Sequence, residues 1–229
     1  MAELELKKYY ICYIDILGYK EHMNNMGEGK FLNILHEAYT IAIRDINIMS
    51  KPTHSNANFI YKIFSDNLVV CTECNRIDSL YSLFYLVYIL QRHFIDSHNL
   101  YLRGSITEGL LYIDQEYIFG SGLVQAYKLE NNIAIYPRII LDKVLNINEV
   151  INSYSEILFC IDGDGYYFID YLVKRANDPK PLYKNHKIHV INKLKEYKNN
   201  EVVYQKYLWC KEYHNRSCIK YNLKEMTIE

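Results

Sequence analysis

The sequence of 229 residues has no apolar run near the roughly 20 residues that a membrane-spanning helix requires. It also has no excess of charge of one sign, because 26 Lys and Arg residues are balanced by 27 Asp and Glu residues. This balance gives no electrostatic reason to expect nucleic acid or an anionic membrane as a partner. The first residues, MAELE, lack the basic and then apolar pattern of a signal peptide. We therefore expect a cytoplasmic protein that binds neither nucleic acid nor a membrane.

A disulfide framework is absent as well, since the six cysteines are scattered at positions 12, 71, 74, 160, 210 and 218. Cys71 and Cys74 have the spacing of a zinc ligand pair, but no second pair follows them. Cys210, His214 and Cys218 would share one face of a helix. We interpret the cysteines as reduced thiols rather than as parts of a structural zinc site. With no internal repeat or long linker, the chain fits one large domain or a domain with an appendage.

Residues 61–70 have the pattern of a β-hairpin, in which two β-rich apolar segments flank Ser65, Asp66 and Asn67. These residue types suit a turn because their side chains can form hydrogen bonds with their own backbone. A carboxylate at such a tip is held in place by the strands on either side of it. Asp66 is therefore a candidate ligand for a divalent metal ion, provided that a second fixed carboxylate lies nearby.

Asp15 is the candidate for that second carboxylate. It lies near the end of residues 8–16, an apolar segment that predicts a central strand. If Asp15 and Asp66 meet, they could hold two metal ions about 3.5–4 Å apart. The alternative interpretation is that Asp66 only forms a turn and that Asp15 only caps a helix. The spacing alone favours this simpler alternative.

The order of the expected elements predicts an α/β (α+β) fold with a ferredoxin-like βαββαβ core. In chain order we expect a strand over 8–16, a helix over 30–48, the hairpin, a helix over 76–97, a strand over 100–107 with a partner over 110–114, a short helix ending near 130 and a strand over 134–141. Residues 1–150 would form this core, and residues 151–229 an extension packed on it. The extension is expected to contain a hairpin around a turn at 162–165 and two polar helices, over 183–198 and 201–221. His186 and His189 are expected on the solvated face of the first of these helices.

Four short motifs follow one another along the expected core. They are YIDILGY at 13–19, KIFSD at 62–66, RGSITEG at 103–109 and GSGLVQAYKLE at 120–130. In order and rough spacing they resemble the motifs Phe-x-Asp-Ile-x-Gly-Phe, Lys-x-x-Gly-Asp, Arg-x-Gly-x-x-x-Gly and Gly-x-x-Val-Asn-x-Ala-x-Arg-Leu-Glu of the class III nucleotidyl cyclases. The resemblance spans about residues 8–141 and leaves the extension outside it.

The resemblance implies a two-metal site and a reaction. In that family, aspartates at the positions of Asp15 and Asp66 bind two Mg²⁺ or Mn²⁺ ions, and the backbone carbonyl at the position of Ile16 is a further ligand. The reaction converts a nucleoside triphosphate into a 3′,5′-cyclic nucleotide and pyrophosphate. The family's site forms between two chains, so a homodimer with shared active sites is implied.

Four further positions correspond to substrate contacts in the family. Lys62 matches a Lys that reads the base, whereas Tyr117 stands where adenylyl cyclases have the partner Asp. Val124 and Lys128 stand where the family has an Asn and an Arg that orient the ribose and stabilise the reacting phosphate. Lys128 keeps the positive charge of that Arg but not its planar fork, and it is the implied catalytic residue.

The sequence also resembles the pyrimidine cyclases of bacterial antiphage (Pycsar) systems, through Ser65-Asp66 and the replacement of the purine-reading Asp by Tyr117. This resemblance implies cCMP or cUMP as the product and a role in antiviral defence. Val124 and Lys128 equally support a catalytically silent domain that has the cyclase fold and binds or senses a nucleotide. A purely structural dimerisation module is a third alternative, but it leaves Asp15 and Asp66 without a role.

Overall fold

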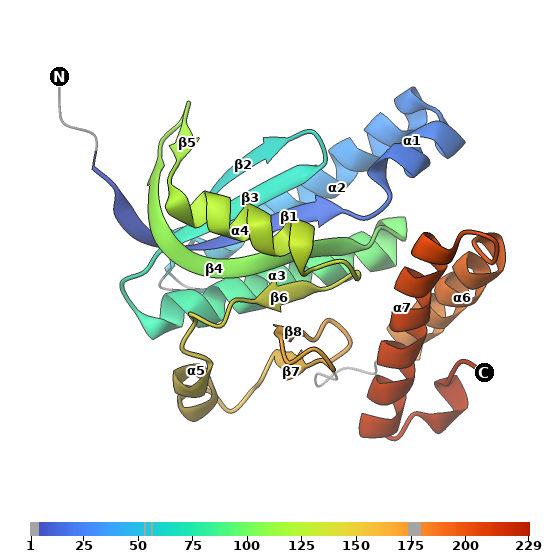
Figure 1. The fold of residues 1–229 in the computed structure, drawn as a ribbon. Coiled ribbons are helices and arrows are strands. Elements are labelled where there is room, and N and C mark those ends of the chain that lie inside the picture. Colours follow the sequence, from blue (N-terminus) through green and yellow to red (C-terminus); the bar gives the residue numbers. More distant parts are fainter. Residues whose placement is uncertain (1–4, 53, 56, 174–179) are drawn as a thin grey trace.

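The computed structural model describes residues 5–52, 54–55, 57–173 and 180–229, which form an eight-stranded sheet and its covering helices (Figure 1). The elements in chain order are β1 (Lys7–Ile16), α1 (Tyr19–Met26), α2 (Glu28–Met49), β2 (Ile60–Phe64), β3 (Asn67–Glu73), α3 (Ile77–His98), β4 (Leu102–Ile113), β5 (Ile118–Phe119), α4 (Ser121–Asn132), β6 (Ile139–Leu141), α5 (Ile147–Ser153), β7 (Phe159–Ile161), β8 (Tyr167–Ile169), α6 (Lys180–Glu196), α7 (Glu201–Lys220) and the 3₁₀ helix η1 (Lys224–Met226).

The strands follow the order β2-β3-β1-β4-β6-β8-β7 across the sheet, and β5 pairs with β4 outside this order. The pairs are antiparallel except β4 with β6, which are parallel. From β1 to β6 the chain has the predicted ferredoxin-like order, with α1 as an addition before α2. The expected α+β fold is therefore confirmed.

Helices cover both faces of the sheet. On one face, α2 and α3 pack against side chains of β1 such as Cys12 and Ile14. On the other face, Ala126 of α4 packs in a cluster with Ile11 and Tyr13 of the same strand. Successive residues of β1 thus meet opposite helical layers, because side chains alternate along a strand. This double burial makes β1 the central strand that its sequence predicted.

Strand β4 corrects one expectation from the sequence. It runs without a break from Leu102 to Ile113, whereas we expected two strands separated at Gly109. Gly109 does not turn the chain but makes room for α4, because a Cβ atom there would lie 2.6 Å from the Cα of Gly122. At Gly120, a Cβ atom would lie 2.3 Å from the backbone oxygen of Leu110. The glycines of the third and fourth motifs therefore allow α4 to lie directly against β4.

The extension continues the sheet of the core. β8 pairs antiparallel with β6, so the hairpin β7–β8 adds two strands to the same sheet. Helices α6 and α7 belong to a buried cluster that includes Ile140 of β6, whereas Ile139 and Leu141 belong to the cluster of α2 and α3. Helix α7 therefore lies on the face of the sheet that carries Ile140 and Phe168, whereas α6 also packs against α3 of the other layer. The domain boundary at residue 150 stays a prediction.

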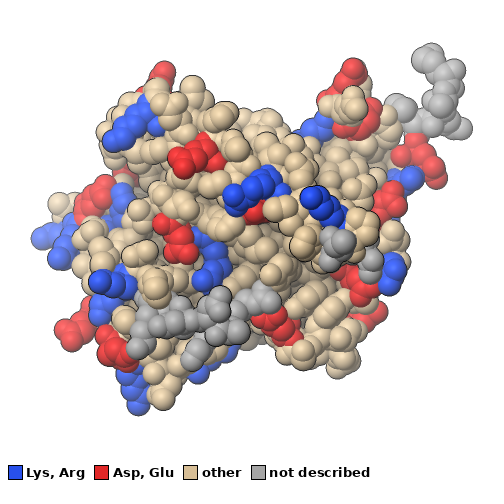
Figure 2. Space-filling model, turned by 180° about the vertical axis from the view of Figure 1, so that it is seen from behind, with Lys and Arg blue, Asp and Glu red and all other residues tan. Residues whose placement is uncertain are grey.

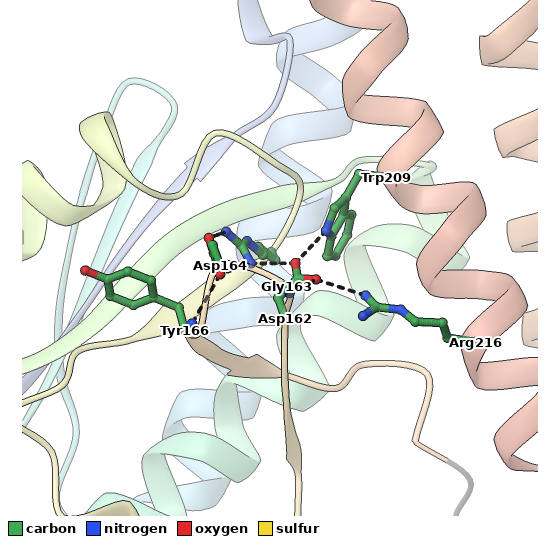
Figure 3. A network of polar contacts seen from close by, with 7 residues as sticks. Asp162, Gly163, Asp164, Tyr166, Trp209 and Arg216 are labelled. Carbon is green, nitrogen blue, oxygen red and sulfur yellow. Dashed lines mark hydrogen bonds and ion pairs between the residues drawn. The ribbon is translucent and has the colours of Figure 1, made fainter.

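A polar network joins the β7–β8 turn to β6 and to α7 (Figure 3). Arg138, which precedes β6 and is 1% exposed, donates to Oδ2 of Asp162 at 2.5 Å and forms an ion pair with Asp164. From α7, Trp209 donates to Oδ2 of Asp162 at 2.6 Å, and Arg216 donates to Oδ1 at 3.1 Å. The sequence predicted only a turn here. The structure shows that the turn also compensates the buried charge of Arg138.

The expectation that His186 and His189 face solvent is wrong. His186 is fully buried and stacks on His214 of α7, with ring planes 2° apart and Nδ1 atoms 3.1 Å apart. His189 is half-buried beside the ring of Tyr101. Helix α6 is polar in composition, but it packs against both α3 and α7. These tertiary contacts decide which of its side chains are buried, and they override the polar pattern.

The surface seen in Figure 2 has mixed charge. Among the described residues on that side, Lys and Arg are interspersed with Asp and Glu, and uncharged surface lies between them. In the described ranges, no helix is both long and apolar enough to cross a membrane. A denser cluster of charged groups lies at the end of β1, where Asp15, Asp66, Arg103 and Glu130 act on one another.

Candidate active site

Asp15 and Asp66 meet where β1 ends beside the tip of the β2–β3 hairpin. Strand β1 pairs antiparallel with β3 and places Asp15 opposite Asn67. The tip is a tight turn of Ser65 and Asp66 between the paired residues Phe64 and Asn67, and Ser65 has a φ of 57°. Asp66 therefore lies next to the end of β1, and its carboxyl group, after burial, contributes to raising the pKa of Asp15. The structure thus brings together the two aspartates that the sequence put forward as metal ligands.

Arg103 lies opposite Asp15 on the other neighbour of β1, strand β4. Its Nε donates to Oδ2 of Asp15 at 2.7 Å. Its Nη2 forms an ion pair with Oε1 of Glu130 at 2.7 Å. Glu130 comes from the inner face of α4 and is buried. One guanidinium therefore connects a carboxylate of the central strand with a carboxylate of the covering helix.

Burial is the main cause of the raised pKa values in this cluster. It raises the pKa of Asp15 to about 6, against the opposing hydrogen bond and charge of Arg103 and with a contribution from Asp66. It raises the pKa of Glu130 to about 7, again opposed by Arg103 and reinforced by the charges of Asp15 and Asp66. Three carboxyl groups here face one guanidinium. A bound cation would lower these pKa values, because it removes the repulsion between neighbouring carboxylates.

The donor atoms at the end of β1 fit a hard divalent cation. Asp15 and Asp66 offer carboxylate oxygens, and Ile16 offers a backbone carbonyl in the adjoining position. Among the described residues, no group of three or more His, Cys, Asp or Glu side chains is arranged to hold a metal ion. Two carboxylates are nevertheless a typical protein contribution for Mg²⁺, which keeps several waters and takes further oxygens from substrate phosphates. The residues present therefore fit the ions that the family resemblance implies.

Lys62 and Tyr117 are brought together at a second place, the turn between β4 and β5. Lys62 of β2 donates to the backbone carbonyl of Gln115 in that turn. Tyr117 follows in the same turn, is 63% exposed, and its backbone N–H donates to Oδ1 of Asp114 at 2.6 Å. The charge of Lys62 is close enough to Asp114 to contribute to lowering the pKa of that carboxyl group, after the hydrogen bonds from Tyr112 and the backbone. A carboxylate, that of Asp114, therefore lies close to Lys62 in this turn.

Val124 and Lys128 lie on the outer face of α4, away from the sheet. Val124 is 52% exposed, and Lys128 is exposed one turn further along the helix. Glu130, on the inner face, is the residue of this helix that reaches the Asp15 cluster. Within one chain the structure therefore does not bring Lys128 into that cluster. Phe64 and Tyr127, both exposed, add apolar surface around it.

Sequence reasoning missed three residues of the cluster. Arg103 and Glu130 lie in the third and fourth motifs, but they received no role. The register of β4 against β1, which puts Arg103 opposite Asp15, is the signal that would have found the first of them. Lys206 of α7 lies close enough to Asp15, Arg103 and Glu130 for their charges to act on its pKa. No motif in the sequence points to Lys206.

Comparison with known proteins supports the fold through structures alone. No protein-family model matches the sequence, and no curated protein matches it. Among solved structures, the chain is similar to the monomeric guanylyl cyclase domain of the RhoGC fusion protein from the aquatic fungus Blastocladiella emersonii, with a TM-score of 0.57 and 10% identity, over 73% of this chain and 98% of that one.

Two further solved structures give the same result. The adenylyl cyclase CyaB from P. aeruginosa has a TM-score of 0.50 and 13% identity, over 77% of this chain and 99% of that one. The catalytic core of a rhodopsin-guanylyl cyclase with converted specificity, in complex with ATPαS, has a TM-score of 0.51 and 11% identity, over 72% of this chain and 95% of that one. The chain therefore has the fold of a nucleotidyl cyclase catalytic domain.

Proposed function

We propose that the protein is a nucleotidyl cyclase that converts a nucleoside triphosphate into a 3′,5′-cyclic nucleotide and pyrophosphate. The observation that carries the proposal is the placement of Asp15 and Asp66 side by side at the end of the central strand, close enough for Asp66 to raise the pKa of Asp15. When bound there, two Mg²⁺ or Mn²⁺ ions supply a lowered pKa of the ribose 3′-hydroxyl and a clamp for the phosphates.

The residues of this chain hold the proposed ligands in place. Arg103 fixes the orientation of Asp15 through its Nε, and Glu130 fixes Arg103 from the other side. The tight turn at Ser65 presents Asp66 from the hairpin. Preorganised groups of this kind reduce the rearrangement that is needed when a substrate binds.

A homodimer with shared active sites is part of the proposal. Lys128 and Val124 lie on the exposed face of α4 with Tyr127, whose half-exposed ring, like that of Phe64, meets the ring of Tyr13. In a second copy of the chain, this face would meet the Asp15 site, and Lys128 would stabilise charge on the reacting phosphate. Light scattering is expected to show a dimer where the protein is active. Activity from a monomer would contradict the shared site.

The proposed base is a pyrimidine, so CTP or UTP would be the substrate. Tyr117 replaces the purine-reading carboxylate and is exposed, and the amine of Lys62 is engaged by the carbonyl of Gln115. Asp114 lies close to Lys62, but a purine site of the adenylyl type would need the amine of Lys62 free to reach the base. The corresponding biological proposal is that the protein acts in the cytoplasm as part of an antiphage defence system.

A catalytically silent nucleotide-binding or sensor domain is the second candidate. The observation that favours it is Val124, an apolar side chain at the position where the family has a ribose-binding Asn. Both candidates are consistent with the fold, because a shared fold does not guarantee activity. Both would bind a nucleotide, and only the cyclase would form a product.

The test incubates the purified protein with each of the four ribonucleoside triphosphates and Mg²⁺ or Mn²⁺. Mass spectrometry is expected to detect a cyclic pyrimidine nucleotide. Asp66→Asn should abolish product, whereas Asp78→Asn should not, because Asp78 lies at the start of α3 and pairs there with Arg76 and Tyr154. Nucleotide binding without any product would instead establish the silent domain.

A further inference from the structure

Helix α7 lies beside the end of β1 that carries the proposed metal ligands. The backbone N–H of Leu17, two residues after Asp15, donates to the carbonyl of Tyr101 at 2.9 Å. The ring of Tyr101 meets the ring of Tyr207 from α7 edge to face, with centroids 6.0 Å apart. Leu17, Tyr101 and Tyr207 belong to the same buried cluster. The part of α7 around Tyr207 is therefore adjacent to the candidate site in the same chain.

Side-chain hydrogen bonds attach the chain to its surroundings before and after this segment. Before the helix begins, the hydroxyl of Tyr197 donates to the side chain of Glu21 in α1. After the segment, Trp209 donates to Asp162 in the network of Figure 3. A side chain presented between these two attachments starts from a fixed position, which is what a binding residue requires.

Lys206 immediately precedes Tyr207 and is half-buried. With the residues in the described ranges it forms no hydrogen bond and no ion pair within 4 Å. Burial and the charge of Arg103 lower the pKa of its amine, whereas the charges of Asp15 and Glu130 raise it. Burying an ammonium group without a direct partner costs free energy, because the group loses part of its hydration. These surroundings point to an anionic partner that is supplied from outside the chain.

We propose that Lys206 binds the triphosphate of the nucleotide in the same subunit whose Asp15 and Asp66 hold the metal ions. This inference rests on the proposed cyclase function. Near the end of β1, the guanidinium of Arg103 is already committed to Asp15 and Glu130. The ammonium of Lys206 is not committed to a carboxylate among the described residues, and an ammonium binds a phosphate oxygen as a point charge.

Two consequences distinguish this role from a structural one. In this role Lys206 contacts phosphate and not the base, so its loss should weaken the binding of CTP, UTP, ATP and GTP by similar factors. A charge that contacts the triphosphate equally in the ground state and the transition state should change KM more than kcat. A packing role for Lys206 would instead lower the melting temperature and would not depend on the length of the phosphate chain.

The test compares Lys206→Met, Lys206→Gln and Lys206→Arg with Lys211→Met, a control on the same helix with a similarly half-buried Lys. Isothermal titration calorimetry in Mg²⁺ measures the Kd of the four triphosphates, of inorganic tripolyphosphate and of cytidine. We expect Lys206→Met and Lys206→Gln to raise the Kd of the triphosphates and of tripolyphosphate by roughly 10- to 100-fold, the range for loss of a charge-assisted hydrogen bond. Cytidine binding should not change, and Lys206→Arg and Lys211→Met should bind as the parent does.

Each outcome decides the inference. A parent protein that binds and cyclises a triphosphate, together with a Lys206→Gln variant of equal Kd and KM, overturns the role of Lys206 and leaves the proposed function intact. A parent protein that binds no triphosphate overturns both. If Lys206→Met melts at a lower temperature, the other two variants still test the role of the charge. Lys206→Gln removes the charge but keeps most of the side-chain stem, and Lys206→Arg keeps the charge. Equal weakening of cytidine and triphosphate by either neutral variant would also contradict phosphate binding.

Discussion

Arg103 and Asp15 face each other across the β1–β4 ladder, and Nε of Arg103 donates to Oδ2 of Asp15 at 2.7 Å. The same guanidinium forms an ion pair with Glu130 on α4. A planar guanidinium can hold two carboxylates in a fixed relative geometry, which the single ammonium of a Lys cannot do. The orientation of the proposed metal ligand therefore depends on a residue to which the motif comparison gave no role.

The first prediction concerns this orientation. Arg103→Lys should keep the positive charge but release Asp15, so Mg²⁺ affinity should fall by about 10-fold or more, as for other residues that orient a metal ligand. The measurement is the rise in melting temperature with Mg²⁺ concentration, which reports binding to the folded protein. Arg44→Lys is the matched control, because Arg44 is exposed on α2. An Arg103→Lys variant with the Mg²⁺ response of the parent would contradict the orienting role.

The second prediction concerns pH. In the metal-free protein the pKa of Asp15 is about 6 and that of Glu130 about 7, both above the ordinary values of 3.8 and 4.5. For each group, the folded state binds more protons than the unfolded chain at any pH between its ordinary pKa and its raised pKa. The free energy of unfolding therefore falls as pH rises from about 4 to 7. For Asp15 the loss should be on the order of 3 kcal/mol.

Urea denaturation in EDTA across this pH range measures the effect. Asp15→Asn should make the fall in stability between about pH 4 and 6 roughly half as steep, because only Glu130 then binds an extra proton in the folded state. Added Mg²⁺ should restore stability at pH 7 in the parent and not in the variant. A parent protein whose stability rises from pH 4 to 7 in EDTA would show that Asp15 and Glu130 do not dominate the pH dependence of its stability.

The third prediction concerns Lys128. Lys128→Ala should lower turnover by about 10²–10³-fold, the cost of losing one preorganised group at a reacting phosphate. Lys128→Arg should hold or raise the rate, because it restores the planar fork. Neither change should alter the melting temperature, since Lys128 is exposed on α4. Equal rates for Lys128→Ala and the parent would remove Lys128 from the mechanism.

The fourth prediction concerns the network of Figure 3. Asp162→Asn removes the charge that faces the buried guanidinium of Arg138 and should lower the free energy of unfolding by about 3 kcal/mol. This is the low end for breaking a buried ion pair, because Asp164 still contacts Arg138. Asp164→Asn is the control and should cost less, since its side chain is 42% exposed. Denaturant unfolding measures the loss in free energy of unfolding for both variants. A larger loss for Asp164→Asn would show that Asp164, and not Asp162, is the main partner of Arg138.

Much of the core was predictable because its determinants are local. The continuous apolar run of β1 predicts a central strand, and the polar tip of the hairpin predicts where β2 turns into β3, so Asp15 and Asp66 could be expected to lie near each other. Gly109 misled the strand prediction because a glycine inside a strand has two explanations, a break or the close approach of another backbone. The sequence does not distinguish them, and the contact with Gly122 does.

The rest of the site depends on contacts between distant segments. Glu130 reaches Arg103 only because α4 lies flat against β4, and Lys206 reaches the same cluster only because α7 packs on Tyr101. His186 was placed in solvent by the polar pattern of α6, and the opposing face of α7 buries it. No local pattern encodes these pairings, because they follow from how the elements pack.

The sheet pairing of β8 with β6 has a consequence for how the molecule folds. β6 is three residues long and lies between β4 of the core and β8 of the extension. Without β8, the outer edge of β6 would present unpaired backbone groups, which is an open site for association with another chain. The residues before and after position 150 therefore complete each other's hydrogen bonding, and we expect them to gain and lose their structure in one cooperative transition.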